Sequence, residues 1–257
     1  MASKSQIKLV RSLHQKKYRE QENLFIAEGV KIVNEILTSY PSIITLLFFT
    51  SENKSYIRPG IIPETVKAIE LGSDDFRKIS VLKNPQGILA VLQKPSVHFP
   101  LLSNAGDLIL ILDNIRDPGN LGTIIRLADW FGIGNIFCSE DTVDCFNPKV
   151  VQATMGAILR VHVFYTGLKK LLTDLAQTKF TIYGSFLKGE NIYTKKLQLP
   201  AAVILGNEAH GISGELLPSI DENILIPNFS FSANRTESLN VSLAASIIIS
   251  EFRRLSV

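Results

Sequence analysis

The feature that most constrains the fold is the C-terminal segment TESLNVSLAASIIISEF. Its apolar residues fall on almost every side of a helix: Leu239, Val241, Leu243, Ala244, Ile247, Ile248 and Phe252. A helix that is apolar nearly all round is buried, either in a large core or against another subunit. Its first N–H groups must find partners and are available to a ligand. Taken alone, the segment predicts a capped core helix with Thr236 or Ser238 as its N-cap.

The rest of the chain alternates strand and helix patterns, which predicts an α/β fold in two units. Residues 1–95 form a small α/β domain that begins with one helix over residues 5–17. Residues 96–106 lie in a stretch with prolines and a glycine and are predicted to be a linker. Residues 107–257 begin with LILILDNI, a continuous apolar run typical of a strand buried on both faces. This second domain is predicted to hold a mostly parallel sheet with helices on both faces.

Composition excludes several classes of protein. No apolar run reaches the roughly 18 residues that span a bilayer, and the N-terminus lacks the apolar core of a secretion signal. Cys138 and Cys145 form no CxxC pair and have no histidine at metal-binding spacing, so they are predicted to be core thiols in a reducing compartment. The prediction is a cytoplasmic protein with no membrane segment and no metal.

Positive charge is concentrated at the N-terminus. Six basic residues precede the first acidic residue, Glu20: Lys4, Lys8, Arg11, Lys16, Lys17 and Arg19. Such a cluster is typical of a phosphate-binding face, and equally of a solvated helix surface.

Three loops follow predicted strands at the edge where parallel-sheet proteins bind ligands. They cover residues 114–126, 205–213 and 226–240, and they offer glycines, amides, hydroxyls, Arg126 and Glu208. None carries the dinucleotide-binding glycine fingerprint, a P-loop or a GxSxG motif, which disfavours an oxidoreductase or a nucleotide-binding enzyme. Arg126 is also placed to form a surface ion pair with Asp129, and Glu208 with His210 is also compatible with plain turn chemistry. This set of side chains suits a site that binds a polar cofactor and orients a substrate hydroxyl better than it suits a hydrolytic site.

These motifs resemble a known family. In order and spacing, DNIRDPGNLGTIIRLADWFGI, VILGNEAHGIS and IP…TESLNVSLAASIII resemble the three motifs of the SpoU (TrmH-type) branch of the SPOUT RNA methyltransferases. The segments KKYREQENLFIAEGVKIVNEIL and NPQGILAVLQ resemble the L7Ae/L30e-like substrate-binding domain of ribosomal-RNA members.

The resemblance implies transfer of a methyl group from S-adenosyl-L-methionine (AdoMet) to a ribose 2′-hydroxyl in RNA, most readily ribosomal RNA. It also implies a deep C-terminal trefoil knot and a homodimer formed through the C-terminal domain, with the active site completed across the subunit interface. Matched residue by residue, the implied catalytic residues are Arg126, Asn120, Glu208, Ser238 and Asn240. The implied cofactor-binding residues are Leu205, Gly206, Ile226 and Leu239. Contacts to RNA are expected from the N-terminal domain at Lys16, Lys17 and Arg19.

One segment departs from the family pattern. Nine residues, NFSFSANRT, separate Pro227 from Glu237, where the family has about five, and a surface loop tolerates such extra length. The longer loop brings Phe229, Phe231 and Arg235 beside the predicted cofactor site. It leaves open a catalytically inactive RNA-binding relative, and a transfer-RNA methyltransferase is a further alternative.

Overall fold

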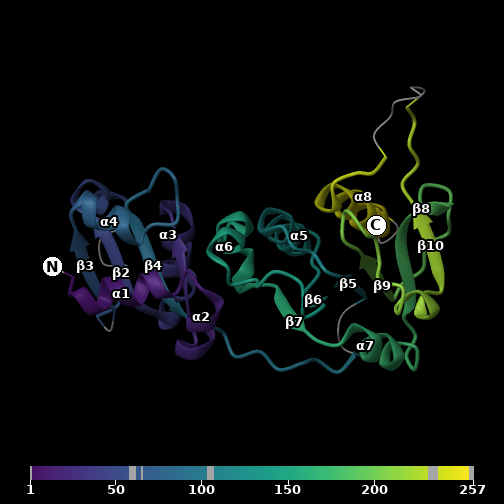
Figure 1. Ribbon diagram of the computed structural model, residues 1–257, viewed down its shortest axis with the longest axis horizontal. Coiled ribbons are helices and arrows are strands. Elements are labelled where there is room, and N and C mark those ends of the chain that lie inside the picture. Colours follow the sequence, from purple (N-terminus) through teal and green to yellow (C-terminus); the bar gives the residue numbers. More distant parts are fainter. Residues whose placement is uncertain (1, 58–61, 65, 103–106, 231–236, 255–257) are drawn as a thin grey trace. The chain divides into compact units, whose positions relative to one another are not determined.

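The computed structural model describes residues 2–57, 62–64, 66–102, 107–230 and 237–254 (Figure 1). By packing, the chain divides into two compact units. Residues 1–96 and 144–159 form the N-terminal unit, and residues 97–143 and 160–257 form the C-terminal unit. The segment 144–159 therefore packs with the N-terminal unit, although in sequence it lies within the predicted domain 107–257.

The N-terminal unit is built on a mixed sheet. Among the described residues the sheet has four strands in the order β1-β4-β2-β3, with β4 antiparallel to both neighbours and β2 parallel to β3. The strands are β1 (Leu24–Glu28), β2 (Ile44–Thr50), β3 (Lys67–Leu71) and β4 (Ile88–Gln93). The helices are α1 (Lys4–Ser12), α2 (Lys16–Glu22), α3 (Val30–Ser39), α4 (Ser73–Ile79) and α6 (Pro148–Thr154), with short 3-10 turns η1 (Pro41–Ile43), η2 (Ser51–Tyr56) and η4 (Ala157–Leu159).

The prediction of one helix over residues 5–17 is wrong. The helix ends at Ser12, Gln15 is extended, and α2 starts a new axis at Lys16. The break lets Arg19 turn inward, where its Nη1 donates to the carbonyl of Leu13 at 2.8 Å. Leu13 itself is fully buried, so the connection is held by core packing that helical periodicity cannot reveal.

The C-terminal unit confirms the predicted α/β class. Within the described residues its sheet has six strands in the order β10-β8-β9-β5-β6-β7, and every neighbouring pair is parallel. The strands are β5 (Leu108–Leu112), β6 (Asn135–Cys138), β7 (His162–Tyr165), β8 (Thr181–Asn191), β9 (Ala201–Leu205) and β10 (Glu222–Leu225). The helices are α5 (Pro118–Trp130), α7 (Leu168–Leu175) and α8 (Val241–Arg254), with the 3-10 turn η5 (Leu217–Ser219). The trefoil knot stays a prediction.

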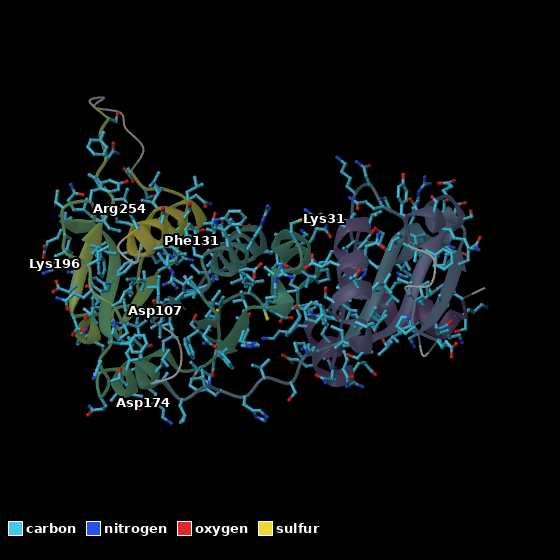
Figure 2. All side chains as sticks on the ribbon, turned by 180° about the vertical axis from the view of Figure 1, so that it is seen from behind. Lys31, Asp107, Phe131, Asp174, Lys196 and Arg254 are labelled. Carbon is cyan, nitrogen blue, oxygen red and sulfur yellow. The ribbon has the colours of Figure 1, made fainter. Side chains whose placement is uncertain are left out.

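Helices cover both faces of this sheet (Figure 1). The apolar side of α7 packs on Ile109 and Ile111 of β5, while α5 and α8 pack together on the opposite face. The end of α8 is fixed by Arg253, which donates to Asp107 at 2.8 Å and to the carbonyl of Phe131 at 2.9 Å; Figure 2 labels both partners. Both cysteines are buried, as predicted. Within the described ranges, no helix is long and apolar enough to cross a membrane.

Helix α8 corrects the cap that was expected for the C-terminal segment. The residue that caps it is Asn240, whose Oδ1 accepts from the backbone N–H groups of Ser242 and Leu243 at 3.0 and 3.4 Å. Ser238 precedes the helix without capping it, and Thr236 lies outside the described residues. In the single chain Leu243 is 58% exposed and Leu239, just before the helix, is 46% exposed, so burial of this surface against another subunit stays a prediction.

Candidate active site

The loops after β5 and β9 lie side by side because these strands are parallel neighbours. Two side chains join the loops. Asp113, which is buried, accepts from the N–H of Ser213 at 2.7 Å, and Asn207 donates to the carbonyl of Asn114 at 2.9 Å. No sequence pattern predicts these two hydrogen bonds, because the partner of a buried aspartate is known only once the fold is known.

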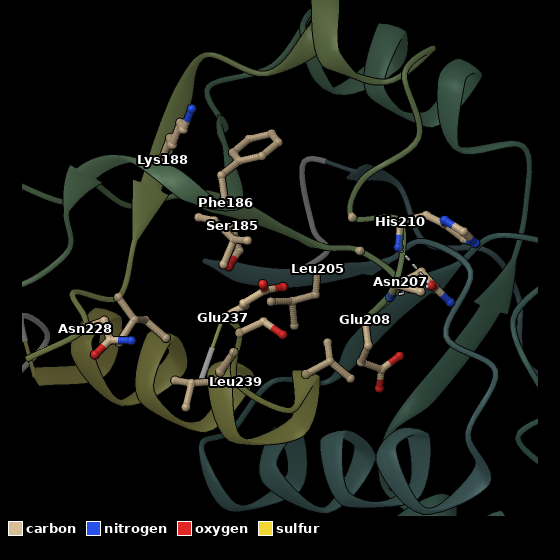
Figure 3. Close-up of a pocket in the computed structure, with 18 of the residues that line it drawn as sticks. Ser185, Phe186, Lys188, Leu205, Asn207, Glu208, His210, Asn228, Glu237 and Leu239 are labelled. Carbon is tan, nitrogen blue, oxygen red and sulfur yellow. Dashed lines mark hydrogen bonds between the residues drawn. The ribbon is translucent and has the colours of Figure 1, made fainter. Parts of the chain in front are cut away.

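The loop after β9 folds into a tight hairpin. Asn207 and Gly211 exchange backbone hydrogen bonds of 3.0 and 2.8 Å, and the Asn207 side chain accepts from the N–H groups of Ala209 and His210. A Cβ on Gly206 would overlap the backbone of Gly211, so this close approach requires glycine. The hairpin presents Glu208 at an exposed position (Figure 3).

Three predicted catalytic residues are joined by side-chain hydrogen bonds. Asn240 Nδ2 donates to Asn120 Oδ1 at 2.9 Å, and Asn120 Nδ2 donates to Glu208 Oε1 through a short contact. Asn120 is held in turn by Asp117, which caps α5 and accepts from the Asn120 N–H at 2.8 Å. The structure therefore brings together one residue from each of the three loops identified in the sequence.

A pocket of about 980 Å³ is lined by Glu208, the residue at one end of this chain of hydrogen bonds (Figure 3). All four predicted cofactor-binding residues line it, together with Glu208 and Ser238: Leu205, Gly206, Ile226 and Leu239. Lining residues that sequence reasoning missed come from β8 and β10: Ser185, Phe186, Leu187, Lys188 and Asn223. They were missed because β8 is longer than its apolar core, extending to Asn191.

Arg126 does not join the other predicted catalytic residues. It lies on the exposed side of α5, does not line the pocket, and has no ion-pair or hydrogen-bond partner in the part of the chain that the structure describes. The predicted alternative partner, Asp129, instead binds Arg160 at 2.9 Å. One turn beyond Arg126, Trp130 is 84% exposed. Within one subunit, therefore, the pocket and this arginine are separate features.

The basic N-terminal cluster contains one wrong prediction. Arg19 is only 1% exposed, and its guanidinium donates to Asp144 through Nη2 at 2.6 Å and through Nε at 2.9 Å. A cation satisfied in this way cannot reach RNA, so Arg19 has a structural role. Lys16 and Lys17 are exposed, with Lys16 at 3.8 Å from Glu20. In the lengthened third loop, Phe229 is 74% exposed and lines the pocket, whereas Phe231 and Arg235 lie outside the described residues.

Comparison with known proteins identifies the class to which this fold and site belong. The chain belongs to the SpoU rRNA methylase family, whose model matches residues 107–250, and a model of the MRM3-like substrate-binding domain matches residues 4–90. The family and the methyltransferase class predicted from the sequence are thereby confirmed.

Individual relatives match over the whole chain. The 23S rRNA (guanosine(2553)-2′-O)-methyltransferase RlmP of Bacillus subtilis is 30% identical over 98% of this chain and 97% of its own length. A Porphyromonas gingivalis structure, described as an RNA methyltransferase of the TrmH family, is 38% identical, covers 99% of each chain and superposes with a TM-score of 0.86. An AdoMet-bound rRNA methyltransferase from Sinorhizobium meliloti is 26% identical, covers 100% of this chain and 98% of that one, and has a TM-score of 0.82.

Proposed function

We propose that this protein transfers a methyl group from AdoMet to a ribose 2′-hydroxyl of ribosomal RNA. The observation that carries the proposal is the pocket at the edge of the parallel sheet, with Asn120, Glu208 and Asn240 joined beside it. The Bacillus subtilis relative is named as a 23S rRNA 2′-O-methyltransferase, and the Sinorhizobium meliloti relative holds AdoMet. Intact catalytic positions argue against an inactive RNA-binding relative.

The residues around the pocket fit AdoMet. Leu205, Ile226 and Leu239 line the pocket and would supply apolar surface to AdoMet, and the volume lies in the range of small-molecule sites. Glu208, Glu237 and Lys188 line the same pocket, so groups of both charges are available to a polar ligand. When bound there, AdoMet supplies an electrophilic methyl group on a sulfonium.

The task of the protein's own residues is to orient the ribose hydroxyl and to manage its proton. Holding the oxygen in line with the methyl group supplies much of the acceleration. The hydroxyl is a weak nucleophile until its proton is at least partly removed. Arg126 carries a guanidinium group, a cation with five N–H donors in a planar fork. A charged arginine suits the developing alkoxide or the neighbouring phosphate, and we assign Arg126 that role in place of the general base.

We further propose that the active site is completed in a homodimer. Arg126 lies away from the pocket of its own subunit, and exposed apolar side chains, Trp130 on α5 and Leu243 on α8, offer a surface for a second copy. Burial against another subunit was one of the two outcomes expected for the apolar C-terminal helix.

Mixing two inactive variants tests this arrangement. Arg126→Ala and Asn240→Ala are prepared separately, then mixed under conditions that let subunits exchange. Half of a random mixture is the heterodimer, and one of its two sites is intact, so about a quarter of the wild-type activity returns. Arg126→Ala mixed with itself is the control. A mixture as inactive as its components would contradict a shared site.

For the RNA, we propose that the N-terminal unit binds ribosomal RNA through Lys16 and Lys17. The match to the MRM3-like substrate-binding domain supports this choice over transfer RNA. The cytoplasmic location stays a prediction from the sequence.

The decisive experiment offers labelled AdoMet with ribosomal RNA lacking this modification, and maps 2′-O-methyl groups at nucleotide resolution. We expect one or a few sites in ribosomal RNA and none in transfer RNA. Arg126→Ala serves as the matched control protein. Methylation of transfer RNA alone would show that transfer RNA, and not ribosomal RNA, is the substrate. Failure to bind AdoMet at all would overturn the proposal.

A further inference from the structure

The hydrogen bonds between Asn240, Asn120 and Glu208 have a direction that the start of α8 determines. The backbone N–H groups of Ser242 and Leu243 can only donate, and both point at one side-chain atom of Asn240. That atom must therefore be the oxygen. The hydroxyl of Ser242, which is buried, adds a third donor to the same oxygen at 2.7 Å.

The consequence passes from one amide to the next. With its oxygen engaged by α8, Asn240 presents its NH₂ group to Asn120 and donates. Asn120 then uses its own oxygen as the acceptor, so its NH₂ group faces Glu208 and donates to Oε1. An amide has one end that only donates and one that only accepts, so neither asparagine side chain can turn over without breaking its hydrogen bonds at both ends.

We propose that this one-way chain is a positioning device in which Ser242 and Asn240 act through Asn120 to hold Glu208 as a hydrogen-bond acceptor beside the pocket. Oε1 has to accept, so the Glu208 carboxyl group is held with this oxygen facing Asn120. Within the described residues, Oε2 has no partner and remains able to accept from a ligand. Ser242, which does not line the pocket, becomes a positioning residue that the sequence did not single out.

The direction is testable because it can be reversed by design. In Asn240→Asp the new carboxylate still caps α8, since aspartate is as good an N-cap as asparagine. It has no donor for Asn120, which must turn its NH₂ group toward position 240 and then face Glu208 with an oxygen. Adding Glu208→Gln rebuilds the chain in the opposite sense. The new amide at position 208 donates its NH₂ group to Asn120, and Asn120 donates to the new carboxylate at position 240.

The double variant therefore recovers what the single variant loses. The inference rests on the proposed function, so calorimetric titration of the wild-type protein with AdoMet comes first. We expect Asn240→Asp to weaken AdoMet binding by about 10- to 100-fold, because the oxygens of Asn120 and Glu208 then face each other with no hydrogen between them. N240D/E208Q is expected to bind within about threefold of E208Q alone, because every amide again has a partner.

A second readout needs no cofactor. Hydrogen exchange of residues 206–213 in the unliganded protein is expected to accelerate in N240D and to return toward the E208Q rate in the double variant, with unchanged thermal unfolding. The matched control is N240D/E237Q, which restores the same net charge beside the pocket but leaves the chain broken, and it should show no rescue. Ser242→Ala is expected to lower AdoMet affinity about 2- to 10-fold, and Ser242→Thr to restore it.

The outcomes separate the two proposals. If the wild-type protein does not bind AdoMet, the proposed function fails. If it binds but the losses in N240D and E208Q simply multiply, or E237Q rescues as well as E208Q does, the directional chain is wrong and the function stands.

Discussion

The two units of this protein use polar side chains in opposite ways. In the N-terminal unit, Arg19 and Asp144 form an ion pair away from water, with the arginine 1% exposed. In the C-terminal unit, Asn240, Asn120 and Glu208 form an open chain at the rim of a pocket. The guanidinium of the buried arginine is engaged inside the protein, whereas the carboxylate at the end of the open chain keeps an oxygen for a ligand. Basic and acidic residues that look alike in sequence thus divide into structural and functional groups by solvent access.

The largest expected effect comes from breaking the buried pair. Asp144→Ala should destabilise the N-terminal unit by about 3–5 kcal/mol, because it leaves the guanidinium of Arg19 buried without its counter-ion. Urea unfolding followed by circular dichroism measures the change, and AdoMet affinity should stay at its wild-type value. In the control R19M/D144L, apolar side chains replace both charges and most of the stability returns. A loss below about 1 kcal/mol would show that water reaches the pair.

Next in size is the exposed arginine. Arg126→Ala should lower methylation by about 100- to 1,000-fold, the effect of removing one charged stabiliser of a transition state. Stability and AdoMet affinity should be unchanged, since no described residue pairs with Arg126. Arg254→Ala is the control, because Arg254 is an exposed cation that pairs with Glu251 of its own helix. Near-normal turnover in single-turnover kinetics would remove Arg126 from the mechanism.

Charge reversal at the two exposed lysines should have an intermediate effect. K16E/K17E is expected to weaken RNA binding about tenfold. The slope of the logarithm of the binding constant against the logarithm of the salt concentration should become less steep by roughly one to two, as expected for the loss of two phosphate contacts. R77E/K78E makes the same change of charge on α4 of the same unit and should bind RNA normally. Filter binding at several salt concentrations measures both variants. Equal losses in the two variants would mean that net charge, and not a defined face, attracts the RNA.

The smallest effect concerns a second buried group of the N-terminal unit. Burial raises the pKa of Glu28, and hydrogen bonds from Ser80 and the N–H of Val81 only partly offset it. Because the folded-state pKa is raised, the stability that protonated Glu28 contributes is present below its ordinary pKa of about 4.3, and is lost as pH rises through the raised value. Wild-type stability should therefore fall across that window, with a slope of at most about 1.4 kcal/mol per pH unit.

Glu28→Gln should flatten this slope, because glutamine has no proton to release. Glu22→Gln, an exposed change on α2, is the control and should keep the wild-type slope. Thermal unfolding between about pH 4 and pH 8 provides the comparison. A slope that survives in Glu28→Gln would assign the pH dependence to another group.

The sequence by itself determined the order of strands and helices in the C-terminal unit and the three loops that supply part of the pocket lining. Continuous apolar runs such as LILIL and AAVIL are typical of strands that are buried on both faces. Parallel strands bring the loops that follow them to one edge of the sheet. The site roles of Leu205, Gly206 and Asn120 came from the resemblance of their motifs to the SpoU family.

Only the tertiary structure decided which polar residues are satisfied internally and which remain open. Arg19 and Lys17 are two positions apart in a basic run, yet one is buried against Asp144, 125 residues away in sequence, and the other faces solvent. The same holds for Asn240. Its side chain accepts from the N–H of Ser242 in α8 and donates to Asn120, which lies 120 positions earlier in the chain. Hydrogen-bond partners distant in sequence depend on three-dimensional packing, and no local periodicity encodes them.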